Sequence, residues 1–439
     1  MTSVSINPRY SYFTKPPINY HNTRFYTTVS DPQMIPGPNS PITFVIQSDT
    51  NYINFAESYL RFKIKLTLAD GANLPDGIDN HQCFMPNTFH TVFSQVRVRV
   101  NDYLVSPSSD QYAYKAYIEE LFAQTSDTRH LETFTNFKLD IGAENAFGAA
   151  ANPNFLERAA LSNRSRLIEL SGQLNVDFLK NSRNILPGTK IEITLFPQPA
   201  PFVIQHDGEA AAAAINFGYR TSEHQYFIRR EEISPATALA IEGRLAKEAA
   251  VMCYPFSALR SFHLTDGIFG YNVDDIWSNQ MPTKMIVCFV PTPNFNGSYA
   301  TNPFWLNPTD AIESIEFFKN SVRSGLQRTC EIDITAHSHN RHTGYRELMN
   351  TLYGGSTAVQ GLPFSLDDWT RGYHFAAIDL TPDGDDAGSH RYPVEQGALS
   401  IRVKFRQALA QSLQMLVYSQ FQETLSINRS RAVTTTINI

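Results

Sequence analysis

Strict alternation of apolar and polar residues constrains this chain more than any other feature of its sequence. In "YLRFKIKLTL" (59–68) every second residue is Leu, Phe or Ile, and Arg, Lys or Thr stands between them. "SQVRVRVNDYLV" (94–105) and "ALSIRVKFRQAL" (398–409) follow the same two-residue period. Because successive side chains of a β-strand point to opposite faces, each stretch predicts a strand with one buried and one solvated face.

The same pattern recurs along most of the chain. Further predicted strands cover 41–47, 190–198, 224–233, 258–267, 283–292, 311–320, 373–384 and 412–421. The 30 Phe, 20 Tyr and 25 Pro suit many strands joined by irregular loops. "NDY" at 101–103 predicts a hairpin bend, because Asn and Asp tolerate positive φ. Six or more strands in each half predict an all-β fold of two antiparallel β-sandwiches in tandem.

A length of 439 residues exceeds what one core usually supports, so two domains are expected. Residues 1–40 are dense in Pro, Tyr and Asn without a sustained period, which predicts an extended N-terminal arm. At 234–250 a short helix is predicted, with Ser234 as N-cap and Pro235 at the first helical position. The remaining predicted boundaries are a first sandwich at 41–235, a linker at 236–256, a second sandwich at 257–431 and a C-terminal tail at 432–439.

Charge and cysteine usage exclude several function classes. The net charge is −6 and no run of Lys and Arg occurs, which argues against a dedicated nucleic-acid binder and leaves open an interior surface that tolerates DNA. The four cysteines are far apart and lack zinc-type spacing, so we expect buried free thiols. The first residues lack the apolar segment of a signal peptide, and no window approaches 18 apolar residues.

The stretch "ITAHSHNRHTGYRELM" concentrates histidines and invites a metal interpretation. His337 and His339 could chelate one ion from a strand, as in sandwich enzymes of the cupin type, which place an acid four or five residues after the second His. Thr343 and Gly344 occupy those positions here, and Glu347 lies further on. Alternation puts both histidines on a polar strand face, so we favour a strand end that leads into a helix.

No other constellation predicts catalysis, a metal or a cofactor. The chain contains no nucleophile elbow, no H-E-x-x-H and no phosphate-binding glycine loop. The helix predicted at 111–124 places Tyr114, Tyr117, Ile118 and Leu121 on one side. Structural motifs therefore dominate this sequence.

Several of these motifs resemble a known family. "VFSQV" (92–96) is followed by "YAYKAYIE" (112–119), and "NG" (296–297), "NPF" (302–304) and "DLTPD" (379–383) come later. Together they resemble, in order and spacing, the capsid proteins of Polinton/Maverick elements and adintovirus-like DNA viruses. Lys115 stands where that pattern usually has Arg. The resemblance runs from about residue 40 to 431 and is poor at 205–255.

The resemblance implies a double jelly-roll major capsid protein of the adenovirus-hexon-like lineage, not an enzyme. Three copies would form a pseudo-hexameric capsomer of an icosahedral shell, located in the virion and assembled inside the host cell. Neighbouring capsomers and a penton would be partners, packaged double-stranded DNA would be met only indirectly, and an internal membrane is left undecided. A penton or other minor capsid protein is the alternative; a jelly-roll metal enzyme or carbohydrate-binding sandwich using His337, His339 and Glu347 is less favoured.

A closed trimer uses one heterologous interface three times. We expect the N-terminal arm and the helix at 111–124 to supply intersubunit contacts, because both are rich in aromatic residues. The candidate contact residues are Tyr10, Tyr12, Phe13, Tyr114, Tyr117 and Ile118.

Overall fold

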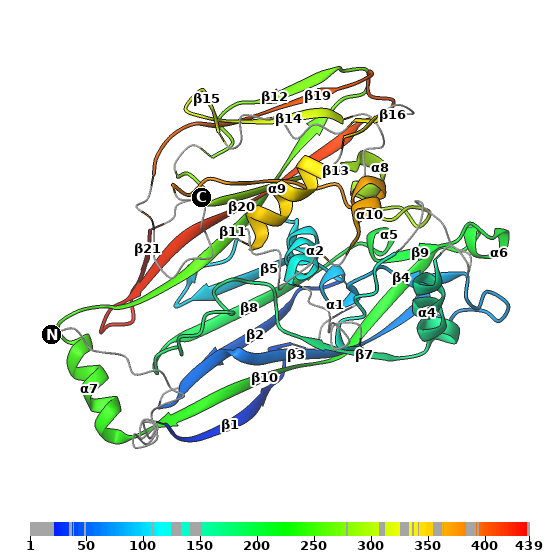
Figure 1. Cartoon of the computed structure of the whole chain (residues 1–439). Coiled ribbons are helices and arrows are strands. Elements are labelled where there is room, and N and C mark those ends of the chain that lie inside the picture. Colours follow the sequence, from blue (N-terminus) through cyan, green and yellow to red (C-terminus); the bar gives the residue numbers. More distant parts are fainter. Residues whose placement is uncertain are drawn as a thin grey trace, which may run out of the picture.

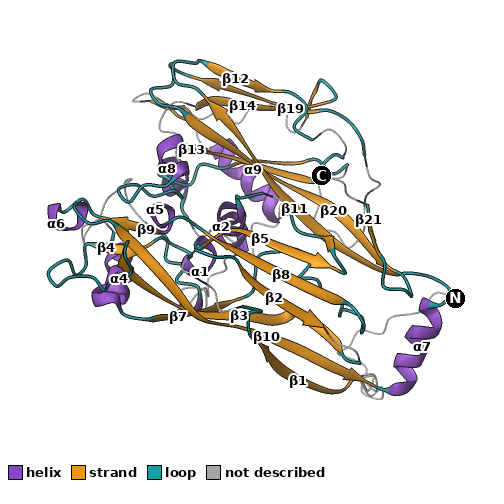
Figure 2. Cartoon of the chain, turned by 180° about the vertical axis from the view of Figure 1, so that it is seen from behind, coloured by secondary structure: helices purple, strands orange, loops and turns teal. Residues whose placement is uncertain are grey.

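Two β-sandwiches account for most of the regular structure, with helices in their connections (Figures 1 and 2). This confirms the predicted all-β fold of two antiparallel sandwiches in tandem. The structure is a computed structural model, and it describes residues 22–34, 37, 39–47, 50–107, 109–123, 133–140, 152–277, 280–306, 312–324, 333–335, 338–340, 342–353, 362, 364–382, 392 and 395–436.

The first sandwich packs two four-stranded antiparallel sheets face to face. Sheet 1A has the order β1 (Asn22–Ser30), β10 (Phe217–Ile233), β3 (Tyr52–Leu68) and β7 (Ile168–Gly172). Sheet 1B has the order β2 (Ile42–Gln47), β8 (Lys190–Pro197), β5 (Phe93–Val100) and β6 (Tyr103–Leu104). Alternation decides which face is buried: Leu60, Phe62 and Ile64 of β3 are fully buried in the core between the sheets.

The second sandwich repeats this arrangement. Sheet 2A has the order β11 (Ala250–Leu264), β20 (Leu413–Ile427), β13 (Lys284–Pro291) and β18 (Ala376–Asp379), and β21 (Val433–Thr435) also pairs with β20. Sheet 2B has the order β12 (Gly270–Val273), β19 (Leu399–Phe405), β14 (Ile312–Lys319) and β15 (Val322–Ser324). Leu399, Ile401 and Val403 of β19 face its core, as predicted.

The two sandwiches match strand by strand. In chain order and in sheet position, β1, β3, β7 and β10 of sheet 1A correspond to β11, β13, β18 and β20 of sheet 2A. The strands of sheet 1B correspond in the same way to those of sheet 2B. The chain is therefore an internal structural repeat, although no exact sequence repeat connects its halves.

Helices occupy the connections between strands. They are α1 (Thr88–Thr91), α2 (Tyr112–Ala123), α4 (Pro153–Ser162), α5 (Ala200–Val203), α6 (Ala210–Ala213), α7 (Pro235–Leu245), α8 (Thr292–Asn296), α9 (His342–Tyr353) and α10 (Leu366–Arg371). Two strand pairs stand apart from the sandwiches: β4 (Gln82–Phe84) with β9 (Ile204–His206), and β16 (Asp333–Thr335) with β17 (Ser338–Asn340). Within the described ranges, every helix is too short or too polar to span a bilayer.

Local predictions from turn and cap chemistry are confirmed. Ser234 caps α7 by accepting a hydrogen bond from the Thr237 backbone N–H, with Pro235 at the first helical position. Asn101 and Asp102 join β5 to β6 with φ of 45° and 69°. Both features are set by residues next to each other in the chain, which is why the sequence alone reveals them.

Three boundaries differ from the prediction. Residues 22–30 of the expected arm form the edge strand β1 on β10. Residues 433–435 of the expected tail pair with β20, and β11 begins at Ala250, inside the expected linker. An extended segment satisfies its backbone hydrogen bonds by pairing with an exposed edge or strand end, and sequence period alone does not reveal this partner.

The cysteines follow the expectation in part. Cys83 and Cys288 are buried, and burial raises the pKa of the Cys83 thiol to about 12. Cys253 is exposed on β11, which corrects the prediction for that residue. Cys330 lies outside the described residues.

Two buried histidines predict that acid destabilises the fold. Burial lowers the pKa of His224 and of His374 to about 4, whereas an unfolded imidazole titrates near pH 6.5. Between about pH 6.5 and 4 the unfolded chain binds more protons than the folded chain. The free energy of unfolding should therefore decrease as the pH is lowered, by at most about 1.4 kcal/mol per pH unit for each histidine. Urea unfolding across this range measures the slope. His374→Leu should remove one histidine's share, and an unchanged slope would contradict the prediction.

Candidate functional site

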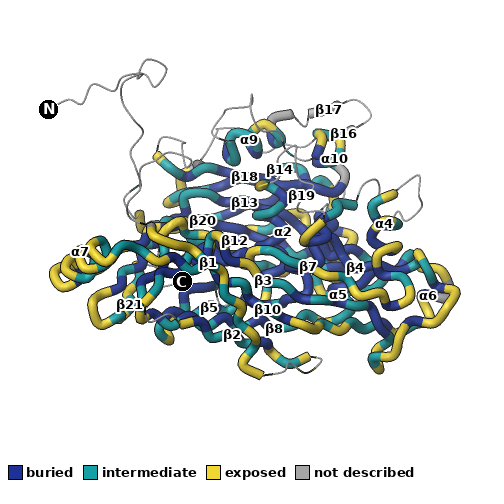
Figure 3. The backbone as a smooth tube through the Cα atoms, turned by 90° about the horizontal axis from the view of Figure 1, so that it is seen from below, coloured by how far each residue is buried: buried dark blue, intermediate teal, exposed yellow. Residues whose placement is uncertain are grey.

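Helix α2 lies between the two sandwiches and is buried on most of its surface (Figures 1 and 3). Its apolar side packs into a third core, which contains residues of both sandwiches. The Tyr117 ring stacks on Phe304 with centroids 4.3 Å apart, and the Tyr114 hydroxyl donates a hydrogen bond to the Pro303 carbonyl at 3.1 Å. We call this region the junction; its core joins α2 to the outward face of sheet 2A.

The junction corrects part of the expected subunit contact. Tyr114, Tyr117 and Ile118 are 3%, 2% and 1% exposed, and they pack against residues of their own chain. They therefore have almost no surface left for a second copy. Amphipathicity correctly revealed an apolar helix face but not which surface covers it. Tyr10, Tyr12 and Phe13 lie outside the described residues.

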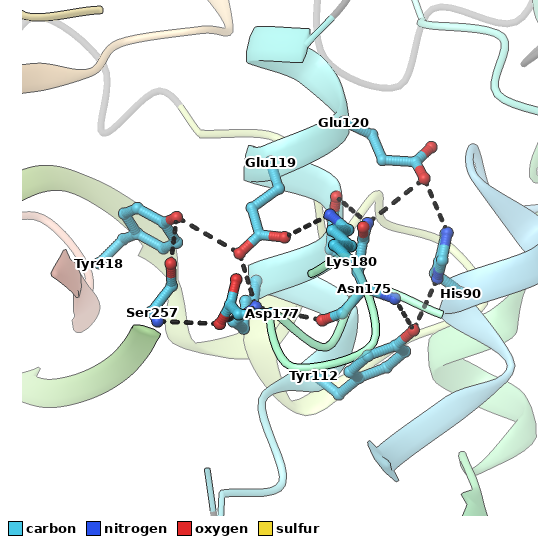
Figure 4. Close-up of polar contacts among 11 residues, drawn as sticks. His90, Tyr112, Glu119, Glu120, Asn175, Asp177, Lys180, Ser257 and Tyr418 are labelled. Carbon is cyan, nitrogen blue, oxygen red and sulfur yellow. Dashed lines mark hydrogen bonds and ion pairs between the residues drawn. The ribbon is translucent and has the colours of Figure 1, made fainter. Parts of the chain in front are cut away.

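A buried ionic cluster lies beside the apolar part of the junction (Figure 4). Lys115 Nζ is 2.6 Å from Glu119 Oε1 and 3.2 Å from Asp177 Oδ2, and all three side chains are at most 11% exposed. Asp177 Oδ2 also accepts a hydrogen bond from the Ser257 backbone N–H at 2.9 Å. Ser257 belongs to β11, so the cluster links helix α2 of the first sandwich to sheet 2A of the second.

Tyr418 of β20 completes this link. Its hydroxyl lies 2.8 Å from Ser257 Oγ and 3.3 Å from Glu119 Oε1. Lys180 Nζ approaches the other Glu119 oxygen at 3.1 Å. Glu119 thus has partners from α2, from the loop after β7 and from sheet 2A, which fixes the angle between helix and sheet.

Charge pairing outweighs burial for the cation and for one of the two acids. Burial alone would lower the pKa of Lys115, but Asp177 and Glu119 raise it overall, so the ammonium stays charged. Burial alone would raise the pKa of Glu119, but Lys115 and Lys180 lower it to about 2. Burial wins for Asp177, and its pKa is raised despite the attraction of Lys115. The cluster therefore depends on a single buried cation, Lys115.

A second chain of hydrogen bonds holds α2 on the first sandwich. The Tyr112 hydroxyl accepts a hydrogen bond from the Asn175 backbone N–H at 3.0 Å, and it is also hydrogen-bonded to His90 Nδ1 at 2.8 Å. The Nε2–H of His90 then donates to Glu120 Oε1 at 2.8 Å. These hydrogen bonds position the helix on the first sandwich.

Sequence reasoning missed the ionic cluster, although a signal was present. Lys115 interrupts the aromatic run of α2, and Glu119 follows one helical turn later, a spacing at which Lys and Glu pair on a helix. Asp177 and Ser257 are far from Lys115 in the chain, and only the fold brings them together.

The histidine-rich stretch forms a hairpin followed by a helix. His339 lies on β17 opposite Ile334 of β16, and α9 begins at His342. A strand end leading into a helix was predicted; the structure instead has two short strands, β16 and β17, that pair with each other before the helix. His337 lies outside the described residues. Among the residues that are described, no three His, Cys, Asp or Glu side chains gather as metal ligands.

Helix α9 packs inward with one of its faces. Leu348 is fully buried, and Tyr345 contacts Trp369 edge-on while its hydroxyl donates to the Phe364 carbonyl at 3.0 Å. Gly344 allows this approach, because a Cβ there would lie 2.9 Å from the Trp369 ring. Glu347 is half-buried, and burial raises its pKa against the opposing effect of Arg346.

Removal of the Lys115 charge should strongly destabilise the chain. Lys115→Met leaves Glu119 and Asp177 buried without their shared cation, and breaking a buried pair in this way typically costs about 3–5 kcal/mol. Urea unfolding near neutral pH measures the loss. Lys404→Met is the matched control, because its pair with Glu313 at 2.6 Å is exposed and should contribute about 1 kcal/mol or less. Equal losses in the two variants would contradict a role for the cluster.

Comparisons with known proteins place this architecture. No protein-family profile matches the chain. An uncharacterized protein of Caenorhabditis elegans is 22% identical over 405 residues, which cover 89% of this chain and 92% of that protein.

Solved structures of viral proteins match nearly the whole chain. The crystal structure of the mavirus major capsid protein has a TM-score of 0.54 at 12% identity, covering 100% of this chain and 96% of that chain. The Faustovirus major capsid protein has a TM-score of 0.57 at 8% identity, covering 96% and 92%. A chain of the Sputnik virophage structure reaches 0.64 at 11% identity, covering 100% and 94%. Together with the strand order described above, these matches show that the chain has the double jelly-roll fold.

Proposed function

We propose that this protein is a structural major capsid protein whose homotrimers form pseudo-hexameric capsomers of an icosahedral shell. The observation that carries the proposal is the complete double jelly roll, matched from end to end by the mavirus and Faustovirus major capsid proteins. Two similar sandwiches in each chain give six similar wedges in a closed trimer. A pseudo-hexagonal unit of this kind tiles a shell.

The junction suits a subunit whose two sandwiches must keep one relative orientation. A large apolar core and a buried ionic cluster hold the two sandwiches together, so each chain enters an assembly with its two wedges at a fixed angle. A site for small-molecule chemistry would need convergent reactive groups instead. The polar groups of the junction are mostly paired with each other.

The presence of two sandwiches favours the major over a minor capsid role. One jelly roll would suffice for a penton, whereas this chain has two complete ones. The less favoured alternative, a metal enzyme or carbohydrate-binding sandwich using His337, His339 and Glu347, has its own test. Stoichiometric zinc or iron in protein purified without chelator, lost in His339→Ala, would support it.

We further propose the lineage of Polinton/Maverick elements and adintovirus-like viruses. The motifs at 92–96, 112–119 and 379–383 support this lineage, and a relative in a nematode suits element-borne genes in invertebrates. The partners would be copies of this chain, neighbouring capsomers and a penton, in a virion assembled inside the host cell. Packaged DNA would be a partner only indirectly, in keeping with the net charge of −6.

Assembly of the purified protein tests the proposal. We expect light scattering to give three times the chain mass, and electron microscopy to show particles of hexagonal outline or shells. Pentamers would favour the penton alternative. A protein that stays monomeric at high concentration in every salt condition would contradict a capsid role.

A further inference from the structure

The outward face of sheet 2A is covered within the chain. One row of side chains crosses this sheet, because Leu259 of β11 pairs with Tyr418 of β20, Tyr418 pairs with Ile286 of β13, and Ile286 pairs with Ala377 of β18. All four are between 2% and 7% exposed. They belong to the junction core, where helix α2 of the first sandwich lies against them.

The corresponding row of sheet 1A, here called the bare row, is covered little by the residues that the structure describes. Val29 of β1 pairs with Phe227 of β10, and Phe227 pairs with Tyr59 of β3. Val29 is 49% and Tyr59 38% exposed, and Phe25, four residues before Val29 on the same face of β1, is 63% exposed. The strands that carry this row are the repeat equivalents of β11, β20 and β13. The same position in the fold is thus buried in one sandwich and open in the other.

The bare row has the composition of a protein contact. The Tyr59 and Phe227 rings stack at 4.8 Å, and the Arg61 guanidinium lies 5.3 Å from the centre of the Phe227 ring. The Arg229 guanidinium lies 3.4 Å from the Phe25 ring. Exposed Tyr, Phe and Arg side chains are enriched where proteins bind each other. A hollow of about 780 Å³, lined in part by Tyr59, Arg61 and Phe227, lies beside the row.

We infer that helix α9 of a second copy covers this row of sheet 1A, as α2 covers the row of sheet 2A. This inference rests on the proposed capsomer and specifies its interface. In chain order, α9 corresponds to α2: α2 comes after β5 and β6 and before β7, and α9 comes after β14 and β15 and before β18. Helix α2 reaches from the first sandwich to the second. By the same logic, α9 would extend from the second sandwich of its own chain to the first sandwich of another copy.

The same chain is not the source of the covering helix. Helix α9 packs against β18 and α10 of its own second sandwich, and its buried side chains belong to the junction core and not to the core of the first sandwich. It also keeps a face that its own chain leaves partly open. Tyr345, Leu348 and Leu352 pack inward, whereas Arg346 is exposed and Met349 is half-buried one turn later.

The resulting contact is heterologous, because sheet 1A of one copy meets α9 of the next. Such a contact closes into a ring when its rotation allows, and three copies with two sandwiches each close the pseudo-hexagon. Each chain therefore carries one donor face and one acceptor face, and the two faces can be disabled separately.

Two single substitutions disable the faces one at a time. Tyr59→Asp places a charge in the bare row, and Met349→Asp places one on α9. We expect each variant to be monomeric at concentrations at least about tenfold above those at which wild type is trimeric, since central interface residues commonly contribute more than 1.4 kcal/mol. Leu239→Asp on α7 is the control; this leucine is 76% exposed and belongs to neither face, so trimers should persist. Circular dichroism and thermal unfolding establish that each variant is folded.

Mixing the two monomeric variants identifies the contact. The intact α9 of Tyr59→Asp can bind the intact sheet of Met349→Asp, and neither complex can grow further, so mass-tagged variants should form one-to-one heterodimers. Homodimers of either variant, or trimers reformed in the mixture, would overturn the inference. So would trimers that persist in both variants, or that are lost only in Tyr59→Asp, because another segment would then cover the row. Monomeric wild type would instead count against the proposed capsid function.

Discussion

The burial of α2 between the two sandwiches is the interaction on which the rest of the structure depends. Each sandwich has its own core, but the outward face of sheet 2A is apolar and would be unstable in water without α2. The cost of burying Glu119 and Asp177 in the same place is offset chiefly by Lys115, which both acids share, and further by Lys180 and the Ser257 backbone N–H. Apolar packing supplies the stability of the junction, and the charges determine one orientation of helix on sheet.

The internal repeat makes the difference between the two sandwiches informative. Matching strand orders give both sandwiches the same outward sheet, yet among the described residues a helix covers this face in sheet 2A and leaves it largely open in sheet 1A. The outward face of sheet 1A therefore lacks a helix equivalent to α2, and helix α9 lacks an outward sheet of the next sandwich to cover. In the proposed capsomer, further copies of the chain supply both, and this connects the geometry of one subunit to the symmetry of the assembly.

Prediction from sequence succeeded where the deciding contacts are local. The alternation of β3 and β19, the hairpin at Asn101 and the cap at Ser234 all follow from neighbouring residues. It missed the hairpin at His339, where a strand leading directly into a helix was expected, and it failed for the subunit role of Tyr114, Tyr117 and Ile118. A polar stretch does not show where it turns back, and an apolar helix face does not show which apolar surface it meets.

The sequence by itself determined the class of fold, the two sandwiches and the apolar side of α2, because periodicity directly records which face of an element avoids water. Only the tertiary structure decided that β1 and β21 join sheets, that Lys115 meets Asp177 and Ser257, and that one outward sheet is covered while its repeat equivalent is bare. These contacts join residues that are distant in the chain. Their partners are chosen by the packing of whole sheets, which no local pattern of residues encodes.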